Sequence, residues 1–156
     1  MVETLLLAVS KSDEDRVAEL ADTAADVVDA DGRVQILHAF DEERYEQRRA
    51  QLGMDEYSET SADDVARRNT VAADLAERLR AQDIAAGIRG AVGDPAEAIL
   101  RAVDSVDADM VVVGGRARSQ TGKFLFGSTA QDVLLEAPVP VTFVKARADA
   151  RTPVEA

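Results

Sequence analysis

The chain has 156 residues, of which 46% are apolar, and its formal net charge is −12. This length suits one domain with a buried core, and this apolar fraction excludes a disordered chain. The absence of cysteine excludes a disulfide scaffold and a thiol catalyst. The acidic surface also argues against non-specific binding to nucleic acid, because it repels phosphate backbones.

The same composition bears on where the protein works. No apolar run approaches the length of a membrane span, and no signal peptide is visible at the N-terminus, so we expect a cytoplasmic protein. Only Lys11, Lys123 and Lys145 are lysine. An acidic excess with so little lysine favours adaptation to high salt, and the alternative is an ordinary acidic cytosolic protein.

The first forty residues predict a strand–helix–strand unit. Residues Leu5–Val9 form a continuous apolar run, as in a strand that is buried on both faces. Ser12 with Asp15 resembles a capping box, and apolar residues then recur every three or four positions up to residue 28. Asp31-Gly32 is a turn signal before a second apolar run, Val34–Phe40. Such a crossover joins parallel strands.

The next forty residues are less regular. Residues 41–62 are charged and lack a clean period, which predicts a loop with one helical turn. A lid over a site and a plain solvated loop both fit that loop. A helical pattern returns over residues 63–82, and a strand with two glycines follows over Ile84–Val92.

The last third predicts two more helix–strand units. Gly93-Asp94-Pro95 starts a helix with an apolar face up to residue 106, because Asp94 can cap it and proline fits the first helical position. Two strands, Met110–Val113 and Val139–Lys145, flank a short helix over residues 128–136. Five strands alternating with helices predict an open α/β sheet, whose glycine-bearing third and proline-bearing fifth strands belong at the edges.

The stretch after Met110 contains the residues that best suit ligand binding. The buried strand ends in Gly114 and Gly115, a polar loop follows, and Gly127 precedes Ser128, which forms a capping box with Gln131. A helix N-terminus at this point offers free N–H groups and a partial positive charge, both of which suit phosphate.

This stretch resembles the glycine signature of the universal stress protein family, G-x2-G-x9-G-(S/T). The first glycine is Gly114, the last is Gly127 and the hydroxyl is Ser128, while Ala117 stands where the pattern has its middle glycine. Residues 93–99 also match a run that is common in the family. The resemblance implies one domain over residues 1–146, with a polar tail over 147–156. It also implies a Rossmann-like parallel sheet in the order 3-2-1-4-5, with helices on both faces.

In the nucleotide-binding branch of that family, this loop wraps the phosphates and ribose of ATP. With the order 3-2-1-4-5, the winding reverses between the first and fourth strands, where ligands of such sheets bind. We therefore expect ATP or AMP, with Mg²⁺ as an optional companion, at the residues Val9, Ser10, Gly114, Gly115, Ala117, Gly127, Ser128 and Thr129.

Two features near this site have alternative readings. Ser10 stands where nucleotide-binding members usually carry an aspartate, which removes one hydrogen-bond acceptor. Arg116, Arg118 and Lys123 would either neutralise phosphate or remain as solvated loop charges.

The function predicted from the sequence is a nucleotide-binding regulatory module in stress response. The alternative is a dimeric interaction protein that binds no nucleotide, and a slow ATPase comes third because no acid–base pair is apparent. His38, the only histidine, lies in a strand and is expected to be buried rather than catalytic or a metal ligand. We expect a homodimer through Val139–Lys145, because an apolar edge strand invites another strand.

Overall fold

The computed structural model describes residues 2–51, 62–115 and 127–145, so the polar tail at 147–156 lies outside them. Its centre is a sheet of five strands in the order β3-β2-β1-β4-β5, with every neighbouring pair parallel. The strands are β1 (Val2–Val9), β2 (Val28–Phe40), β3 (Ala85–Val92), β4 (Met110–Gly115) and β5 (Val141–Lys145). The predicted α/β fold and strand order are confirmed.

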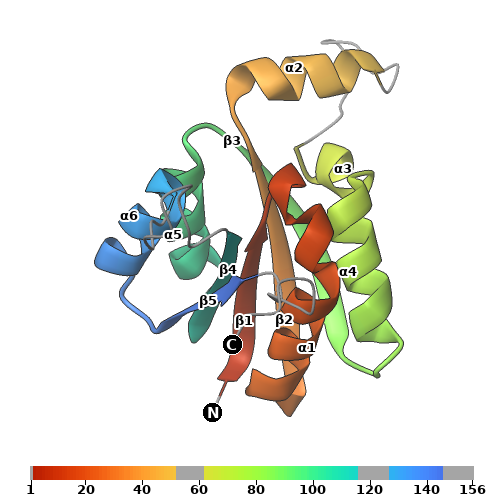
Figure 1. Ribbon diagram of the computed structural model, residues 1–156, viewed down its shortest axis with the longest axis vertical. Coiled ribbons are helices and arrows are strands. Elements are labelled where there is room, and N and C mark those ends of the chain that lie inside the picture. The colour runs from red at the N-terminus through yellow and green to blue at the C-terminus, as the bar shows by residue number, and fades with distance from the viewer. Residues whose placement is uncertain (1, 52–61, 116–126, 146–156) are drawn as a thin grey trace, which may run out of the picture.

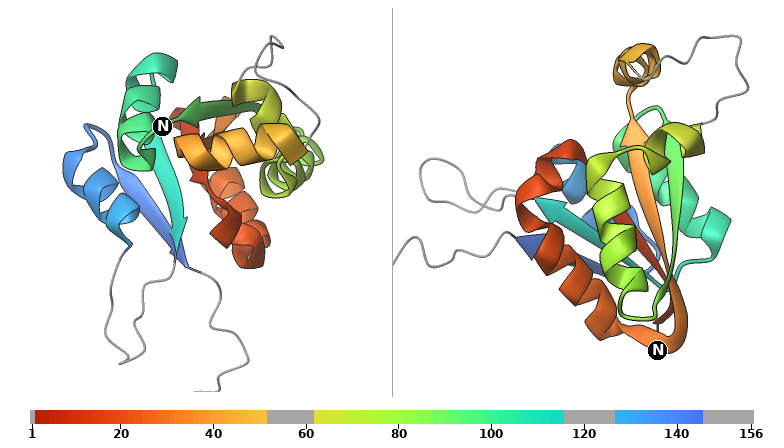
Figure 2. Two further views of the ribbon diagram at one scale, coloured as in Figure 1. Left: turned by 90° about the horizontal axis from the view of Figure 1, so that it is seen from above. Right: turned by 90° about the vertical axis from the view of Figure 1, so that its right-hand side faces the viewer.

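Helices cover both faces of this sheet (Figures 1 and 2). A 3₁₀ turn, η1 (Lys11–Arg16), leads into α1 (Val17–Val27), which lies with α4 (Thr70–Arg80) on one face. On the opposite face lie α5 (Pro95–Val106) and α6 (Ser128–Glu136). Two further helices, α2 (Glu42–Gln51) and α3 (Ala62–Arg67), follow β2 in the chain.

The central strand supplies both cores. Leu5 and Leu7 point into the core under α1 and α4, while Leu6 points into the core under α5 and α6. All three leucines are fully buried. Successive side chains of a strand face opposite sides of the sheet, so a run without polar residues is stable only when both sides are covered.

The charged segment after β2 is more helical than the sequence predicted. Ten residues form α2, where only one helical turn was expected. The helix is polar nearly all round, so it has no apolar stripe that a search for periodicity can detect. It is anchored instead through Tyr45, whose ring lies 5.9 Å from that of Phe40 at the end of β2.

The helix predicted over residues 63–82 is divided in two. Asn69 separates α3 from α4, and its side-chain oxygen accepts a hydrogen bond from the Ala72 N–H at 3.1 Å. Asparagine is a strong N-cap residue, so it starts a new helix within a pattern that reads as continuous.

Three element starts also differ from expectation. Strand β2 begins at Val28, so Asp31-Gly32 lies within it, at an irregularity in its pairing with β1. Asp13 rather than Asp15 closes the turn after β1, because its carboxylate accepts the Ser10 N–H at 2.8 Å. Strand β5 begins at Val141, after Pro140, since proline has no N–H for the ladder.

The two edges of the sheet differ in how they are covered. At the β3 edge, the Gly90 N–H donates to Asp63 of α3 at 2.7 Å, and a side chain at Gly90 would overlap the carbonyl of Ala62. The start of α3 therefore covers this edge, a common protection against strand addition. Strand β5 forms the other edge and pairs only with β4 among the described strands.

None of the helices in the described ranges is long and apolar enough to cross a membrane.

One carboxylate joins the start of β1 to the start of β4. Asp109 accepts hydrogen bonds from the N–H groups of Glu3 and Thr4, both at 3.0 Å, and donates its own N–H to the Thr4 carbonyl at 2.8 Å. The Thr4 N–H, followed by that of Glu3, lowers the pKa of Asp109 from its ordinary value of 3.8. The ionised form is therefore favoured in the folded protein.

We expect Asp109→Ala to lower the melting temperature near neutral pH. A depressed folded-state pKa stabilises the fold above the unfolded value of 3.8, and this stability is lost as the pH falls through the lower folded value. The difference between wild type and variant should therefore shrink below pH 3.8 in a series of thermal melts. Asp22→Ala, at an exposed position of α1, serves as the control. A difference for Asp109→Ala that stays constant into strong acid would contradict this account.

Candidate functional site

A cavity of about 750 Å³ opens where the winding of the sheet reverses, beyond the carboxyl ends of β1 and β4. The end of β1, the turn after it, the end of β4 and the start of α6 all contribute to its wall. Its size lies within the range typical of small-molecule sites, and its position is the one that open α/β sheets use for ligands.

Most of the residues predicted to form the site meet in this cavity. Seven of the eight line it, and the eighth, Ala117, lies outside the described residues. The seven are Val9, Ser10, Gly114, Gly115, Gly127, Ser128 and Thr129. They come from positions more than one hundred residues apart in the chain, which the parallel sheet brings to the same edge.

The cavity has an apolar floor. Side chains from three elements form it, Leu37 of β2, Ile99 of α5 and Val113 of β4, while the Val9 side chain belongs to the core on the other face of the sheet. All four are buried. Such a floor would accept a flat apolar group, while the polar turn and the helix start provide the hydrogen bonds.

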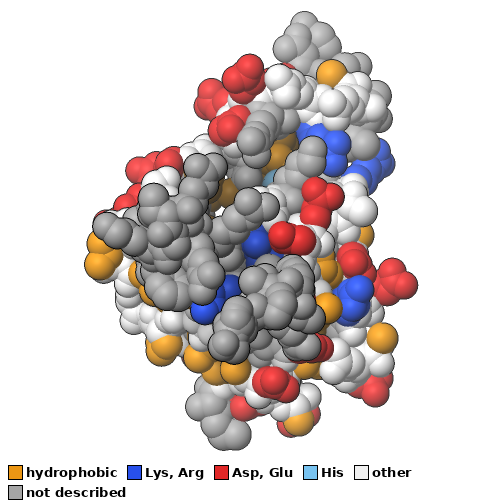
Figure 3. Space-filling model, viewed as in Figure 1, with side chains coloured by type: hydrophobic (Ala, Val, Ile, Leu, Met, Phe, Trp, Pro, Cys, Tyr) orange, Lys and Arg blue, Asp and Glu red, His pale blue; other side chains and the backbone are white. Residues whose placement is uncertain are grey.

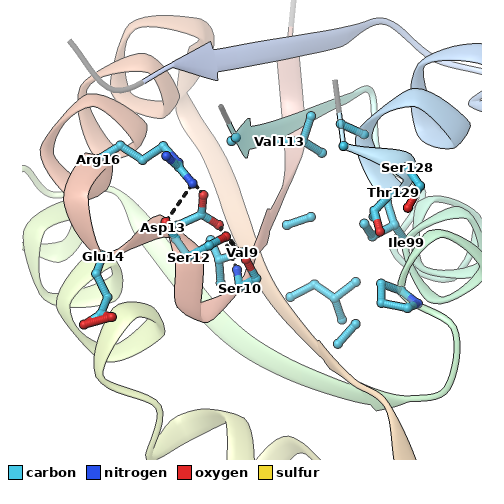
Figure 4. Close-up of a pocket in the computed structure, with 18 of the residues that line it drawn as sticks. Val9, Ser10, Ser12, Asp13, Glu14, Arg16, Ile99, Val113, Ser128 and Thr129 are labelled. Carbon is cyan, nitrogen blue, oxygen red and sulfur yellow. Dashed lines mark hydrogen bonds and ion pairs between the residues drawn. The ribbon is translucent and has the colours of Figure 1, made fainter. Parts of the chain in front are cut away.

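The start of α6 lies across the cavity from the turn after β1 (Figure 4). Gly127 is the N-cap, its carbonyl accepts the Gln131 N–H at 3.0 Å, and it makes no side-chain cap. Ser128 is thus the first helical residue and not the predicted cap, because the helix ladder already begins on Gly127. The N–H groups of this first turn have no partner within the helix.

The three described glycines of the site differ in why glycine stands there. A Cβ at Gly114 would come 2.6 Å from the Asp13 carboxylate, and one at Gly115 would come 3.1 Å from the Phe143 ring. A Cβ at Gly127 would meet no described atom within 4 Å, and Gly127 has φ −64°, which any residue adopts. The described fold therefore has no need of glycine at position 127.

Two functional candidates were missed by sequence reasoning. Asp13 and Arg16 line the cavity and form an ion pair between Asp13 Oδ1 and Arg16 Nε at 2.6 Å. Figure 4 shows the two side chains facing each other beside Ser10, while Glu14 extends away from them. Their i, i+3 spacing is common in any charged helix, so nothing in the sequence distinguishes this pair from solvated ones.

The described wall of the cavity is acidic. Glu14, Asp15 and Asp41 line it together with Asp13, and Arg16 is the one cation among the described lining residues. Acidic side chains are also spread over the face of the molecule shown in Figure 3. Arg116, Arg118 and Lys123, for which phosphate neutralisation and solvated loop charge were both open, lie outside the described residues.

The described residues hold no group of three or more histidine, aspartate or glutamate side chains arranged to bind a metal ion. His38 is buried in β2, as predicted, with its ring stacked 4.3 Å from that of Phe40. It is not among the residues that line the cavity. The arrangement therefore suits binding through backbone groups and an apolar floor.

Known proteins resemble this chain in sequence and in fold. A universal stress protein of Mycolicibacterium smegmatis is 45% identical over 73 residues, which span 46% of this chain and 56% of that protein. The chain thus matches little more than half the length of this curated relative.

Among solved structures, a universal stress protein from Archaeoglobus fulgidus has a TM-score of 0.62 and 27% identity, covering 93% of this chain and all of that one. A second structure from this organism, in complex with dAMP, has a TM-score of 0.59 and 24% identity, covering 91% and 97% of the two chains, and shows likeness of fold alone.

The model of one family, the universal stress protein family, matches residues 1–145. This match spans nearly the whole chain, and it agrees with the strand order and with the glycines that line the cavity. The chain belongs to the universal stress protein family.

Proposed function

We propose that this chain binds an adenine nucleotide, AMP or ATP, in the cavity between β1, β4 and α6, and acts as a regulatory module in the cytoplasmic stress response. The observation that carries the proposal is the convergence of the glycine positions, Ser128 and the end of β1 on one cavity. The dAMP complex of the Archaeoglobus fulgidus protein is consistent with it.

The phosphates would lie at the start of α6. There the N–H groups of Ser128 and Thr129 belong to the first helical turn and line the cavity. Backbone donors and the helix dipole favour an anion at this end. The base would then extend over the apolar floor toward Leu37 and Ile99.

Mg²⁺ would arrive with a triphosphate, since the described residues offer no ready-made metal site. An AMP ligand would need no ion. Hydrolysis is not part of the proposal, which concerns binding alone.

The regulatory step would be a change of surface. A nucleotide in the cavity would contact both the end of β4 and the start of α6, which flank residues 116–126. Strand β5 follows α6 directly in the chain. Fixing the start of α6 would therefore act on the surface that a partner of β5 meets. A ligand shifts such an equilibrium only by its differential affinity for the two states.

The second candidate function is that of a homodimeric interaction protein that binds no nucleotide. One observation favours dimerisation through β5: among the described residues, no helix is bonded along this edge strand as α3 is at the opposite edge. The partly buried side chains of Val141 and Phe143 add apolar surface there. A second copy could complete the edge through a two-fold contact.

The pairing of β4 with β5 shows which backbone groups such a partner would meet. The Pro140 carbonyl accepts the Val111 N–H at 3.0 Å, so residue 140 faces β4. Backbone direction alternates along a strand, so Thr142 and Val144 also face β4 while Val141 faces away from it. Val141, rather than Thr142 or Val144, is therefore the position at which to test the edge.

Gly127→Val should weaken the binding of AMP by at least about tenfold, which corresponds to about 1.4 kcal/mol. Its side chain has room in the fold but would stand where the phosphate approaches the helix start. Titration calorimetry measures the affinity, and a thermal melt verifies that the fold persists. Gly127→Ala should give an intermediate loss, and Ala81→Val, at the exposed end of α4, should bind as wild type. Unchanged affinity in Gly127→Val would rule out this placement of the phosphate.

Val141→Pro should yield monomers that keep their fold. It removes an N–H directed away from β4, whereas Thr142→Pro removes one directed toward β4 and should lower the melting temperature. Sedimentation at micromolar concentration reports the oligomeric state. A monomeric wild type, or a Val141→Pro variant that is still dimeric, would contradict the edge-to-edge contact.

The melting temperature should rise with KCl from millimolar to molar concentrations. The net charge is −12, so the carboxylates of the folded protein repel one another at low ionic strength. The Debye length is about 30 Å at 0.01 M and falls to about 3 Å at 1 M. We propose that the acidic surface is an adaptation to high salt, for which the rise should continue beyond the range of screening. A melting temperature that does not change with salt would contradict the proposed adaptation to high salt.

A further inference from the structure

The largest fully buried side chain in the described structure is a charged one, Arg16, which is 1% exposed. Its partner Asp13 is 2% exposed, and both lie in the wall of the cavity. Burying a charge costs much of its hydration, and an ion pair repays that cost only with good geometry and further hydrogen bonds. The position of these two charges therefore needs a reason beyond general stability.

The guanidinium of Arg16 holds the turn after β1 together. Its Nε donates to Asp13 at 2.6 Å, one terminal nitrogen donates to Asp15 at 3.1 Å, and the other donates to the Ser12 carbonyl at 2.7 Å. The other oxygen of Asp13 accepts the Ser10 N–H at 2.8 Å. The three donors lie on three separate nitrogens of the planar guanidinium, a spacing that lysine, with its donors on one atom, does not reproduce.

The same pair also lies against the end of β4, which adjoins it in the cavity wall. A Cβ on Gly114 would come 2.6 Å from Asp13 Oδ1 and 3.0 Å from Arg16 Nε. The first distance is too short for a carbon atom and the second is a tight contact, and the two side chains are held by their own hydrogen bonds. Glycine at position 114 thus lets the turn and the strand end approach each other.

We propose that the Asp13–Arg16 pair is a positioning clamp that fixes the turn after β1 against Gly114. It sets the shape of the cavity where Ser10 and Gly114 line it, and it thereby raises the affinity for the nucleotide. Asp13 and Arg16 are positioning residues that act through Ser10 and Gly114. This role in affinity rests on the proposed function, whereas the packing of the clamp against Gly114 does not.

The first test needs no ligand. Gly114→Ala should lower the melting temperature of wild type more than it lowers that of the Asp13→Ala/Arg16→Met variant, in which the nearest atom, Asp13 Oδ1, is gone and a flexible methionine replaces the guanidinium held by hydrogen bonds. The double replacement is used because removing one charge alone would leave the other buried without its partner. Gly127→Ala, whose Cβ meets no described atom, should have the same small effect in both backgrounds. Equal lowering by Gly114→Ala in both backgrounds would overturn the clamp.

The second test measures the affinity for AMP by titration calorimetry. The Asp13→Ala/Arg16→Met variant should bind about tenfold more weakly than wild type, at a temperature where melts show both proteins to be folded. The matched control is Asp74→Ala/Arg78→Met, which removes an exposed ion pair of 3.0 Å on α4 and should leave the affinity unchanged. Wild-type affinity in the Asp13→Ala/Arg16→Met variant would overturn the role of the clamp in binding. A wild type that binds neither AMP nor ATP would overturn the proposed function instead, and the melting temperatures would then test the clamp alone.

Discussion

The burial of β1 on both faces is the constraint on which the rest of the structure depends. Leu5, Leu6 and Leu7 follow one another without a polar residue, so each face of the strand needs its own cover. The chain meets this need by placing α1 and α4 on one side and α5 and α6 on the other. Because the winding must change direction to cover the second face, the strand order reverses beside β1. The cavity lies at this reversal.

The cavity combines groups with opposite preferences for charge. The start of α6 is suited to an anion, whereas the turn after β1 brings Asp13, Glu14 and Asp15 to the wall. The buried Arg16 accounts for two of these carboxylates, since it pairs with Asp13 and Asp15. An anionic ligand is therefore better placed toward α6, with its uncharged part toward β1. This uneven distribution of charge follows from packing. The Arg16 side chain is buried in the wall beside Asp13, whereas the Glu14 side chain extends away from the Asp13–Arg16 pair (Figure 4).

The acidic surface contributes little to stability or association through ion pairs. Asp64–Arg67 and Asp74–Arg78 are exposed ion pairs of the described structure whose side chains are about half accessible to water, and such pairs contribute little to stability. Protection of the β3 edge comes instead from a partly buried contact, the hydrogen bond from Gly90 to Asp63. Association through the β5 edge would likewise draw on apolar side chains and backbone pairing rather than on charge, because a second copy carries the same negative excess.

The sequence by itself determined the fold class, the strand order and seven of the residues that line the cavity. Apolar runs such as Leu5–Val9 and glycine spacings such as Gly114 to Gly127 are local patterns, and local patterns survive in the sequence. It did not determine α2, since a helix without an apolar face leaves no period. It also missed the break at Asn69, because one capping residue does not interrupt the pattern around it. Only the tertiary structure decided that Asp13 and Arg16 are buried against Gly114. Their partner lies about a hundred residues away in the chain, and a charged pair in a turn is buried only when another strand end packs against it.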